Sequence, residues 1–212
     1  ARHDQQRTDL DRVLRQRGAL LKQAGGRLNA ELELTLDVFD AKLTAAGEAL
    51  AGARRDLVDE LAPVLSEAYA RVARRPAPVV ATYDPPWMAE GLAAALVAAR
   101  RDDLRRGVST VGPHRDDLDL SLNGLPARTH ASQGEQRSLA LALRLAAHEV
   151  VTRRTATTPV LLLDDVFSEL DPDRSDALLH SLPAGQTILS TAGALPTGAV
   201  PGRVLHVREG VV

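Results

Sequence analysis

The sequence predicts an α/β protein in which an antiparallel helical arm precedes a mostly parallel sheet with buried helices. Over the first third of the chain, apolar residues recur every three or four positions, which is typical of long helices that pack together. Further on, apolar runs at 160–163 and 186–190 flank a helical pattern. A strand, helix and strand in succession indicate parallel strands joined by a right-handed crossover.

Composition limits the function classes. The 212 residues carry 26 Lys and Arg against 28 Asp and Glu. The net charge is therefore nearly balanced and by itself gives no evidence for a polyanionic partner. The absence of cysteine excludes disulfides, thiolate metal sites and cysteine catalysis. Aromatic residues make up 2% of the chain, which disfavours a base-stacking platform for single strands. No run reaches membrane-spanning length, and we expect a cytoplasmic protein without a membrane partner.

The arm is predicted from two apolar stripes, one at residues 8–24 and one that begins after Gly25-Gly26. The second stripe consists of Leu28, Leu32, Leu36, Phe39, Leu43, Ala46, Leu50, Ala53, Leu57 and Leu61. Its steps of four and three are typical of a coiled-coil seam, so we expect the two helices to pack antiparallel. Because the stripe continues beyond Pro63, we expect a kink there and not an end.

Several arginines lie on or near the predicted polar side of the arm, and they allow two interpretations. These are Arg54, Arg55, Arg71, Arg74 and Arg75. They would contact phosphates if the arm tracked DNA, but a solvated helix face explains them as well, and we favour that interpretation. We place the arm at residues 1–76, and a strand and helix that complete the arm domain at 77–107.

Within 77–107, residues 79–83 indicate a strand, and residues 87–105 a helix. Two arginine pairs, Arg100-Arg101 and Arg105-Arg106, enclose Asp102-Asp103, a charge pattern typical of an exposed helix end.

A hairpin is predicted around Asn123-Gly124, which follows alternating apolar residues at 118, 120 and 122. The preceding residues 114–117 (His, Arg, Asp, Asp) are compatible with metal or phosphate binding. We favour turn residues with mutual ion pairs.

Ser132 opens a helix that we expect to run to about residue 153, apolar nearly all round and therefore buried. Ser132 and Glu135 match a capping box, which explains both residues by itself. Gly134 is not explained in that way, because glycine in a first helical turn costs stability. Glycine would let a ligand approach the backbone closely. A helix N-terminus with a hydroxyl and a glycine is typical of a phosphate-binding site.

The run 160–163 predicts a strand buried on both faces that ends on Asp164 and Asp165. Two buried carboxylates require a cation or a proton, and ligands collect beyond the carboxyl ends of parallel strands. We interpret the pair as a Mg²⁺-nucleotide site, in which Asp164 holds the metal and Asp165 orients or deprotonates water. The alternative is two ordinary loop aspartates, with Asp165 as a helix cap. Asp171 and Pro172 begin the next helix, and we expect Asp171 to lie beside the first two carboxylates.

After that helix, at about 173–182, the sequence predicts a buried strand at 186–190 that ends on Ser190-Thr191. Edge-type strands are expected at 203–207 and 211–212.

Three pieces in this order resemble the ATPase head of ABC and SMC proteins: SQGEQR at 132–137, LLLDDVFSELD at 161–171, and the strand ending in Ser-Thr. With GPHRDDL at 112–118 and RVLRQRGALLKQ at 12–23, the chain resembles the RecF family from about residue 10 onward. The resemblance implies that residues 108–212 are the C-terminal lobe of an ABC-type head.

The resemblance also implies roles for residues. The signature motif, which contacts the γ-phosphate of ATP held by the opposite subunit, would comprise Ser132, Gln133, Gly134, Glu135, Gln136 and Arg137. Asp164 would be the Walker B ligand of Mg²⁺, and Asp165 takes the position of the catalytic Glu of many relatives. Residues 168–171, with Asp171, would form the D-loop, and Thr191 lies where many ABC ATPases have a switch histidine.

The chain departs from the family pattern in one respect: it contains no G-x-x-x-x-G-K-[ST] run, because neither Lys22 nor Lys42 follows a glycine. It therefore resembles the later part of a RecF polypeptide, and we expect it not to bind ATP tightly by itself.

For the complete protein the resemblance implies a weak, DNA-stimulated ATPase that closes as an ATP-dependent homodimer on duplex DNA or duplex/single-strand junctions. RecR and RecO are the implied partners, and recombinase loading and SOS induction the implied outcomes. Two alternatives stay open: another SMC-like ATPase, whose arms would be longer, and a non-enzymatic scaffold whose arm binds a partner.

Overall fold

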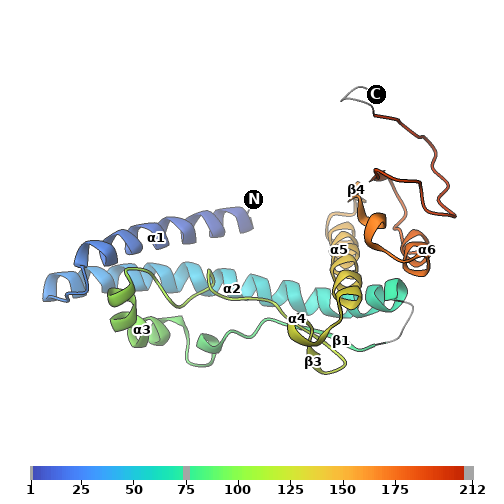
Figure 1. Cartoon of the computed structure of the whole chain (residues 1–212). Helices are drawn as coiled ribbons and strands as arrows, with labels where there is room; N and C mark the ends of the chain where they lie inside the picture. The colour runs from blue at the N-terminus through green and yellow to red at the C-terminus, as the bar shows by residue number, and fades with distance from the viewer. Residues whose placement is uncertain (1, 74–76, 208–212) are drawn as a thin grey trace. The chain divides into compact units, whose positions relative to one another are not determined.

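The computed structural model (Figure 1) describes residues 2–73 and 77–207. It divides into two compact units: Ala1–Glu60 with Ala81–Asp119, and Leu61–Val80 with Leu120–Val212. We call the first the arm unit and the second the head unit. Among the described residues, no helix is both long enough and apolar enough to span a membrane.

In the arm unit, α1 (Arg2–Ala24) turns back along the start of α2 (Ala30–Ala73). Gly25 and Gly26 make the turn with φ of 57° and 82°, and the Asn29 side chain accepts from the Leu32 N–H at 2.8 Å near the start of α2. Leu21 packs with Leu36. The predicted antiparallel arm is thus confirmed, because a residue late in α1 meets one early in α2.

Helix α2 does not stop at Pro63, which lies inside it, as expected. A proline in a helix interior removes one backbone hydrogen bond. The apolar stripe continues past it, with Leu65 and Val72 fully buried, so packing outweighs that loss.

The second half of the arm unit differs from the prediction. Instead of one helix over 87–105, a 3₁₀ turn η1 (Pro86–Ala89) precedes α3 (Leu92–Arg106). Gly91, at φ 87°, separates them. That left-handed conformation suits glycine, and it lets α3 begin in a new direction.

A three-stranded sheet has the order β1 (Val79–Thr82), β2 (Asp119–Leu122), β3 (Leu125–Pro126). Strands β2 and β3 pair antiparallel, and Asn123 and Gly124 between them have φ of 52° and 77°. The predicted hairpin is confirmed, since both turn residues adopt the positive φ that Asn-Gly favours. The short helix α4 (Ala127–His130) follows.

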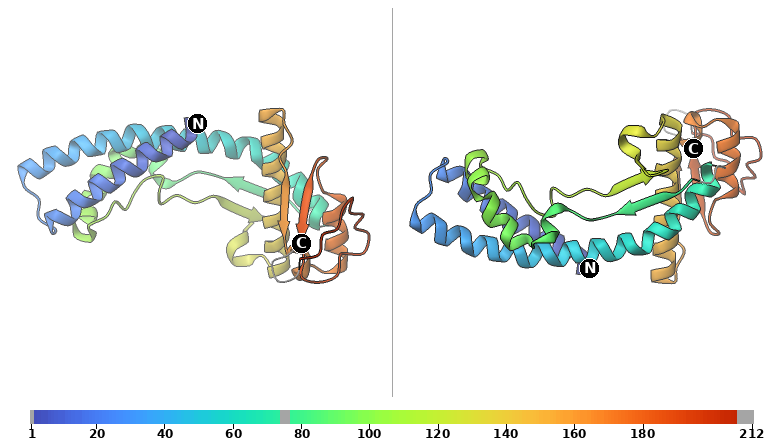
Figure 2. Two further views of the ribbon diagram at one scale, coloured as in Figure 1. Left: turned by 90° about the horizontal axis from the view of Figure 1, so that it is seen from above. Right: turned by 90° about the horizontal axis from the view of Figure 1, so that it is seen from below.

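The rest of the head unit consists of α5 (Gln133–Thr155), β4 (Leu161–Asp164), the 3₁₀ turn η2 (Val166–Glu169), α6 (Pro172–His180) and β5 (Thr187–Ser190). Strands β4 and β5 pair in parallel, with Asp164 opposite Ser190. Figure 2 shows the two strands alongside α5. The predicted parallel pair with its crossover helix is confirmed.

The burial predicted for these elements is wrong in three places. Strand β4 is buried on one face only, since Leu162 is 69% exposed, and Ile188 of β5 is 52% exposed. A two-stranded sheet covered by helices on one face leaves its other face open. Helix α5 likewise exposes Ala140 and Arg144 while burying Leu139 and Ala142, so it is not buried all round.

The edge-type strands expected near the end of the chain are not observed at 203–207, which form no strand, and residues 211–212 lie outside the described residues.

Candidate nucleotide-binding site

The first turn of α5 forms the predicted capping box. The Ser132 hydroxyl oxygen accepts from the Glu135 N–H at 3.3 Å, and the Glu135 carboxylate accepts from the Ser132 N–H at 2.8 Å and its hydroxyl at 2.7 Å. Gln136 donates its side-chain amide to the Ala131 carbonyl at 2.9 Å. Within the described residues, nothing accepts from the N–H groups of Gln133 and Gly134, so two donors of this helix end remain available.

Gly134 has a neighbour that the sequence did not reveal. A Cβ built on Gly134 would lie 2.3 Å from Nη1 of Arg174, on α6. The group that approaches this glycine within the chain is therefore a guanidinium. Arg174 also lies 3.3 Å from the Asp171 carboxylate, so it connects the first turn of α6 to the first turn of α5.

Tyr69 of α2 is 2% exposed. Burial first, and then the Glu135 charge, raise the pKa of Tyr69 above its ordinary value of 10.0, whereas the Arg174 charge lowers it. Charges at the starts of α5 and α6 thus influence a phenol that is buried in the head unit.

The end of β4 presents Asp164 and Asp165 side by side in sequence, and both are exposed. This corrects the expectation that they are buried: the open face of the two-stranded sheet leaves them accessible. Asp164 accepts a hydrogen bond from the Ser190 hydroxyl on β5. Asp165 has φ 47° and ψ 26°, and its N–H donates to the Ser190 carbonyl at 3.0 Å. Its side chain makes no capping hydrogen bond, so the interpretation of Asp165 as a side-chain cap is wrong.

The segment after Asp165 is fixed by local hydrogen bonds. Ser168 donates its hydroxyl to the Asp165 carbonyl at 2.9 Å. Asp171 caps α6 as predicted, accepting from the Arg174 N–H at 2.8 Å. Asp171 is thereby committed to its own helix and to Arg174. Among the described residues, no three His, Cys, Asp or Glu side chains form a group that could hold a metal ion, so Asp171 does not complete a metal site with Asp164 and Asp165.

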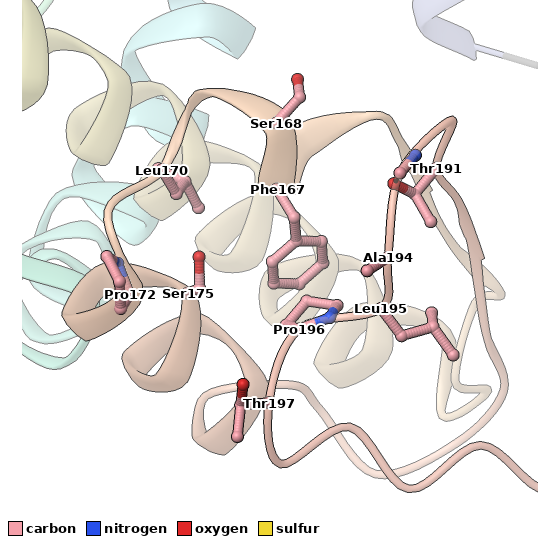
Figure 3. A pocket seen from close by; sticks show the side chains of 11 residues that line it. Phe167, Ser168, Leu170, Pro172, Ser175, Thr191, Ala194, Leu195, Pro196 and Thr197 are labelled. Carbon is pink, nitrogen blue, oxygen red and sulfur yellow. Dashed lines mark hydrogen bonds between the residues drawn. The ribbon is translucent and has the colours of Figure 1, made fainter.

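A pocket of about 290 Å³ lies beside this segment. Figure 3 shows the Phe167 ring pointing into it, toward Pro196. Thr191 lines the same pocket, and its hydroxyl oxygen accepts from the Gly193 N–H at 3.1 Å. The pocket therefore adjoins the segment at 168–171 and the residue after β5.

The end of β4 fits a Mg²⁺ ion that is bound mainly by the phosphates of a nucleotide. Mg²⁺ is usually held by one or two carboxylates together with substrate phosphates and water. Asp164 supplies one oriented, accessible carboxylate. Since no three His, Cys, Asp or Glu side chains among the described residues form a group that could hold a metal ion, phosphate and water oxygens would complete the coordination.

The other predicted candidates serve the arm unit. Asp116 accepts from the Tyr83 hydroxyl at 2.7 Å and from Trp87 Nε1 at 2.9 Å, while His114 and Arg115 contact the Ser109 carbonyl. The preference for turn residues at 114–117 is supported, and His114, Arg115 and Asp116 make these contacts within the arm unit. The mutual ion pairs stay a prediction. Burial, and then the hydrogen bond to Asp116, raise the pKa of Tyr83 to about 12.

The arm arginines are structural in part. Arg54 donates to the Pro113 carbonyl at 2.5 Å and lies 5.9 Å from the centre of the Tyr83 ring, so it is not free for DNA. In the head unit, Arg71 lies 3.8 Å from Glu149. Arg74 and Arg75 lie outside the described residues.

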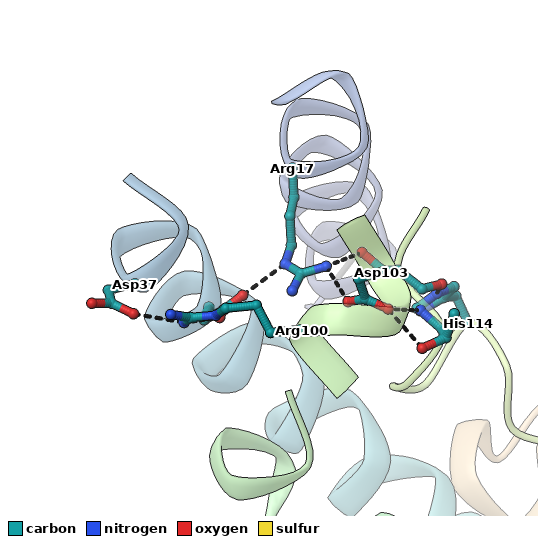
Figure 4. Close-up of polar contacts among 8 residues, drawn as sticks. Arg17, Asp37, Arg100, Asp103 and His114 are labelled. Atoms are coloured by element: carbon teal, nitrogen blue, oxygen red, sulfur yellow. Dashed lines mark hydrogen bonds and ion pairs between the residues drawn. The ribbon is translucent and has the colours of Figure 1, made fainter. Parts of the chain in front are cut away.

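Sequence reasoning missed a buried ion-pair network in the arm unit (Figure 4). Arg17 is fully buried and contacts Asp40 at 2.7 Å and Asp103 at 2.6 Å. Arg100 contacts the other oxygen of Asp40 at 2.6 Å. The expectation of an exposed charge pattern is thus wrong for Arg100 and Asp103, because these two face α1 and α2. Both residues fall at the helical spacing of the buried face of α3, with Leu92, Leu96 and Leu104, and their contacts with α1 and α2 set them apart from their exposed neighbours.

The chain was compared with protein-family models, curated proteins and solved structures. No protein-family model matches the chain. The chain is 42% identical to the DNA replication and repair protein RecF of Streptomyces avermitilis over 97% of its own length, and 45% identical to that of Frankia alni over 87%. It covers 59% and 53% of these relatives, so it spans about half the length of the curated proteins it matches.

Two solved structures are similar in fold. They are described as the recombination mediator protein RecF-ATPrS and RecF-ATP in the RecFOR pathway. The TM-scores are 0.78 and 0.76, with 27% and 28% sequence identity. The matches cover 93% and 91% of this chain, and 55% and 54% of those chains.

Proposed function

The chain belongs to the RecF family, and from that premise we propose that it carries the arm and the signature-bearing part of an ATP-dependent DNA-binding protein of recombinational repair and replication. In the family-length protein, binding of ATP between two copies closes a clamp on duplex DNA or a duplex/single-strand junction. RecR and RecO are its partners, and recombinase loading and SOS induction are its outcomes.

The observation that carries the nucleotide part is the first turn of α5. It is capped by Ser132, keeps the N–H groups of Gln133 and Gly134 available, and carries no side chain at Gly134. A capped helix start with free N–H groups favours a phosphate oxygen through hydrogen bonds and the helix dipole. We assign residues 132–136 to the γ-phosphate of the nucleotide held by the other copy.

Asp164 and Asp165 would serve the nucleotide of their own copy. Bound ATP with Mg²⁺ supplies the phosphoryl group and the positive charge that neutralises it in transfer. Asp164, oriented by the Ser190 hydroxyl, holds the ion. Asp165, whose backbone is fixed by the Ser190 carbonyl, orients or deprotonates the attacking water. Asp171 in the D-loop and Thr191 lie at the edge toward the other copy.

This chain contains no Walker A run, and we propose that by itself it neither binds ATP tightly nor hydrolyses it. The activity belongs to a protein of family length. The open apolar face of β4 and β5, with Leu162 and Ile188, is available for further packing in such a protein.

The catalytic assignment is tested with Asp165→Asn in a family-length protein that contains this chain. We expect normal ATP binding, a loss of turnover of about a hundredfold or more, and a trapped ATP-bound dimer, because the general base is removed. Turnover and dimer mass are measured together. Hydrolysis at the parental rate would show that Asp165 has no catalytic role.

The signature assignment is tested with two substitutions at one position. Ser132→Asp keeps a good helix cap but places a negative charge where the phosphate would lie, whereas Ser132→Thr keeps both the cap and the hydroxyl. We expect ATP-dependent dimerisation to be lost in the first variant and retained in the second. Equal dimerisation of both would leave Ser132 as a cap alone.

A further inference from the structure

A second pocket lies in the arm unit, far along the chain from the nucleotide residues. It has a volume of about 670 Å³ and opens between the C-terminal ends of α1 and α3. Its lining consists of Leu21, Lys22, Gly25, Gly26, Arg101, Leu104, Arg105, Arg106 and Gly107. We call it the α1–α3 pocket. Its apolar floor is Leu21 and Leu104, and its rim is made of glycines and cations.

The cations at the rim are largely uncompensated. Lys22, Arg101, Arg105 and Arg106 are all exposed. No acidic side chain lines the pocket. Only Arg105 has an ion-pair partner, Asp102 at 2.8 Å, while the other three have none among the described residues. The side chains thus leave about three positive charges around one opening.

Cations at helix C-termini also have an ordinary explanation, because they offset the negative end of the helix dipole. Two helix ends contribute roughly half a negative charge each, which is about one charge in total. Backbone caps reduce that further: the Gly25 N–H donates to the Lys22 carbonyl at 3.2 Å, and the Gly107 N–H to the Asp103 carbonyl at 2.8 Å. The positive charge therefore exceeds what the two dipoles require.

The walls of the pocket are held in place from below. Arg17 of α1 contacts both Asp40 of α2 and Asp103 of α3. Arg17 and Asp103 are fully buried, so the two helix ends cannot move apart without separating buried charges. Such a fixed arrangement lowers the entropic cost of binding an anion.

The rim glycines leave the entrance open. Gly25, Gly26 and Gly107 all have positive φ and carry no side chain to cover the opening. No aromatic residue lines the pocket, so it offers no surface on which a base would stack. The chemistry fits phosphate oxygens and not bases.

We propose that the α1–α3 pocket binds the phosphodiester backbone of duplex DNA, independently of sequence. The proposal rests on the DNA-binding function proposed above and locates one of its contacts at Lys22, Arg101 and Arg106. It requires no ATP, because no residue of the nucleotide site takes part.

The test uses the purified 212-residue chain without nucleotide and a fluorescent 30-base-pair duplex, with anisotropy measured over a range of salt concentrations. The double variant Arg101→Gln/Arg106→Gln removes two rim charges. The control is Arg12→Gln/Arg15→Gln, two arginines earlier on α1 that contact Asp9 and the Asp11 carbonyl. All these side chains lie outside the core, so circular dichroism should show equal folding.

We expect the pocket variant to bind about three- to tenfold more weakly, and the slope of log affinity against log salt to fall by about 2, one for each phosphate contact. The control should change neither. If the chain binds the duplex and the pocket variant binds equally well, the pocket assignment is overturned while DNA binding stands. If the unaltered chain does not bind the duplex, the DNA contact of the arm is overturned.

The alternative occupant of the α1–α3 pocket is an acidic segment of a protein partner. Binding of a poly-glutamate peptide tests that alternative. Binding of that peptide with loss in the pocket variant, at unchanged duplex affinity, would replace DNA by an acidic protein segment and overturn the proposal. The ATP-dependent dimerisation tests of Ser132 do not involve these residues, so the two sets of results fail separately.

Discussion

The two units treat their charged side chains in opposite ways. In the arm unit, Arg17, Asp40 and Asp103 are buried, and Arg17 binds both carboxylates. In the head unit, Asp164 and Asp165 are exposed, and the Asp164 carboxylate accepts a hydrogen bond from the Ser190 hydroxyl. Buried charges must be paired within the fold, since desolvation is costly. Exposed charges at the end of a strand remain free to bind other groups.

This difference separates structural from functional polar residues better than residue type does. The arginines that the sequence pattern grouped together divide accordingly: Arg100 belongs to the buried network, whereas Arg101 lies at an open pocket. The same residue type one position apart thus serves stability in one case and, as we propose, binding in the other.

The largest effect expected is at Arg17. Arg17→Ala leaves Asp40 and Asp103 without their shared cation and should reduce the free energy of unfolding of the arm unit by about 3–5 kcal/mol. Urea unfolding followed by the fluorescence of Trp87, the sole tryptophan, measures it. Arg12→Ala, which removes an exposed pair with Asp9, should cost less than about 1 kcal/mol. Similar losses in both variants would refute a special role for burial.

The next effect concerns Asp116, the acceptor for Tyr83 and Trp87. Asp116→Asn should lower the Tyr83 pKa from about 12 toward its ordinary value of 10.0, because the negative acceptor disappears. Ultraviolet titration resolves it, since Tyr69 is the only other tyrosine.

The same shift has a consequence for stability. Tyr83 is neutral in both states below pH 10, and above it the unfolded chain ionises first, so its contribution to stability falls between pH 10 and about 12. Asp116→Asn should diminish that loss. A parental alkaline unfolding curve together with an unchanged Tyr83 pKa would show that Asp116 does not control this phenol.

A smaller effect is expected at the capping box of the head unit. Ser132→Ala removes the acceptor for the Glu135 N–H and should destabilise α5 by about 1 kcal/mol. Hydrogen exchange of the first-turn amides reports it locally. Ser132→Asn should restore most of the protection, because asparagine caps as well. Failure of asparagine to do so would indicate that the hydroxyl has a contact beyond the cap.

The smallest effect tests the connection between α5 and α6. Arg174→Ala removes a positive charge that lowers the Tyr69 pKa, so that pKa should rise slightly. Gly134→Ala should act in the same direction, since a Cβ would displace the Arg174 guanidinium. Arg137→Ala, on the same turn of α5, serves as the control. A Tyr69 pKa that is unchanged in both variants would show that the guanidinium does not hold this place in solution.

Local patterns were sufficient for much of the fold. The Asn123-Gly124 hairpin, the cap at Ser132 and the start of α6 at Asp171 follow from short-range rules that need only a few neighbouring residues. The parallel pairing of β4 and β5 followed from the strand–helix–strand order.

Burial was harder to predict, for a physical reason. An apolar run does not state how many layers cover it, so β4 was expected to be buried on two faces and is buried on one. Arg174 was missed for a related reason: the cost of Gly134 indicated that some group approaches, but the identity of that group depended on where α6 packs.

The amino-acid order alone thus determined the helices, the turns, the strand pairing and the family resemblance, because these depend on spacing along the chain. Which charges are paired inside, which stay exposed, and that a guanidinium covers Gly134 were decided by the tertiary structure. Those properties depend on distances between segments as remote in sequence as Arg17 and Asp103, and desolvation gives them their energetic weight.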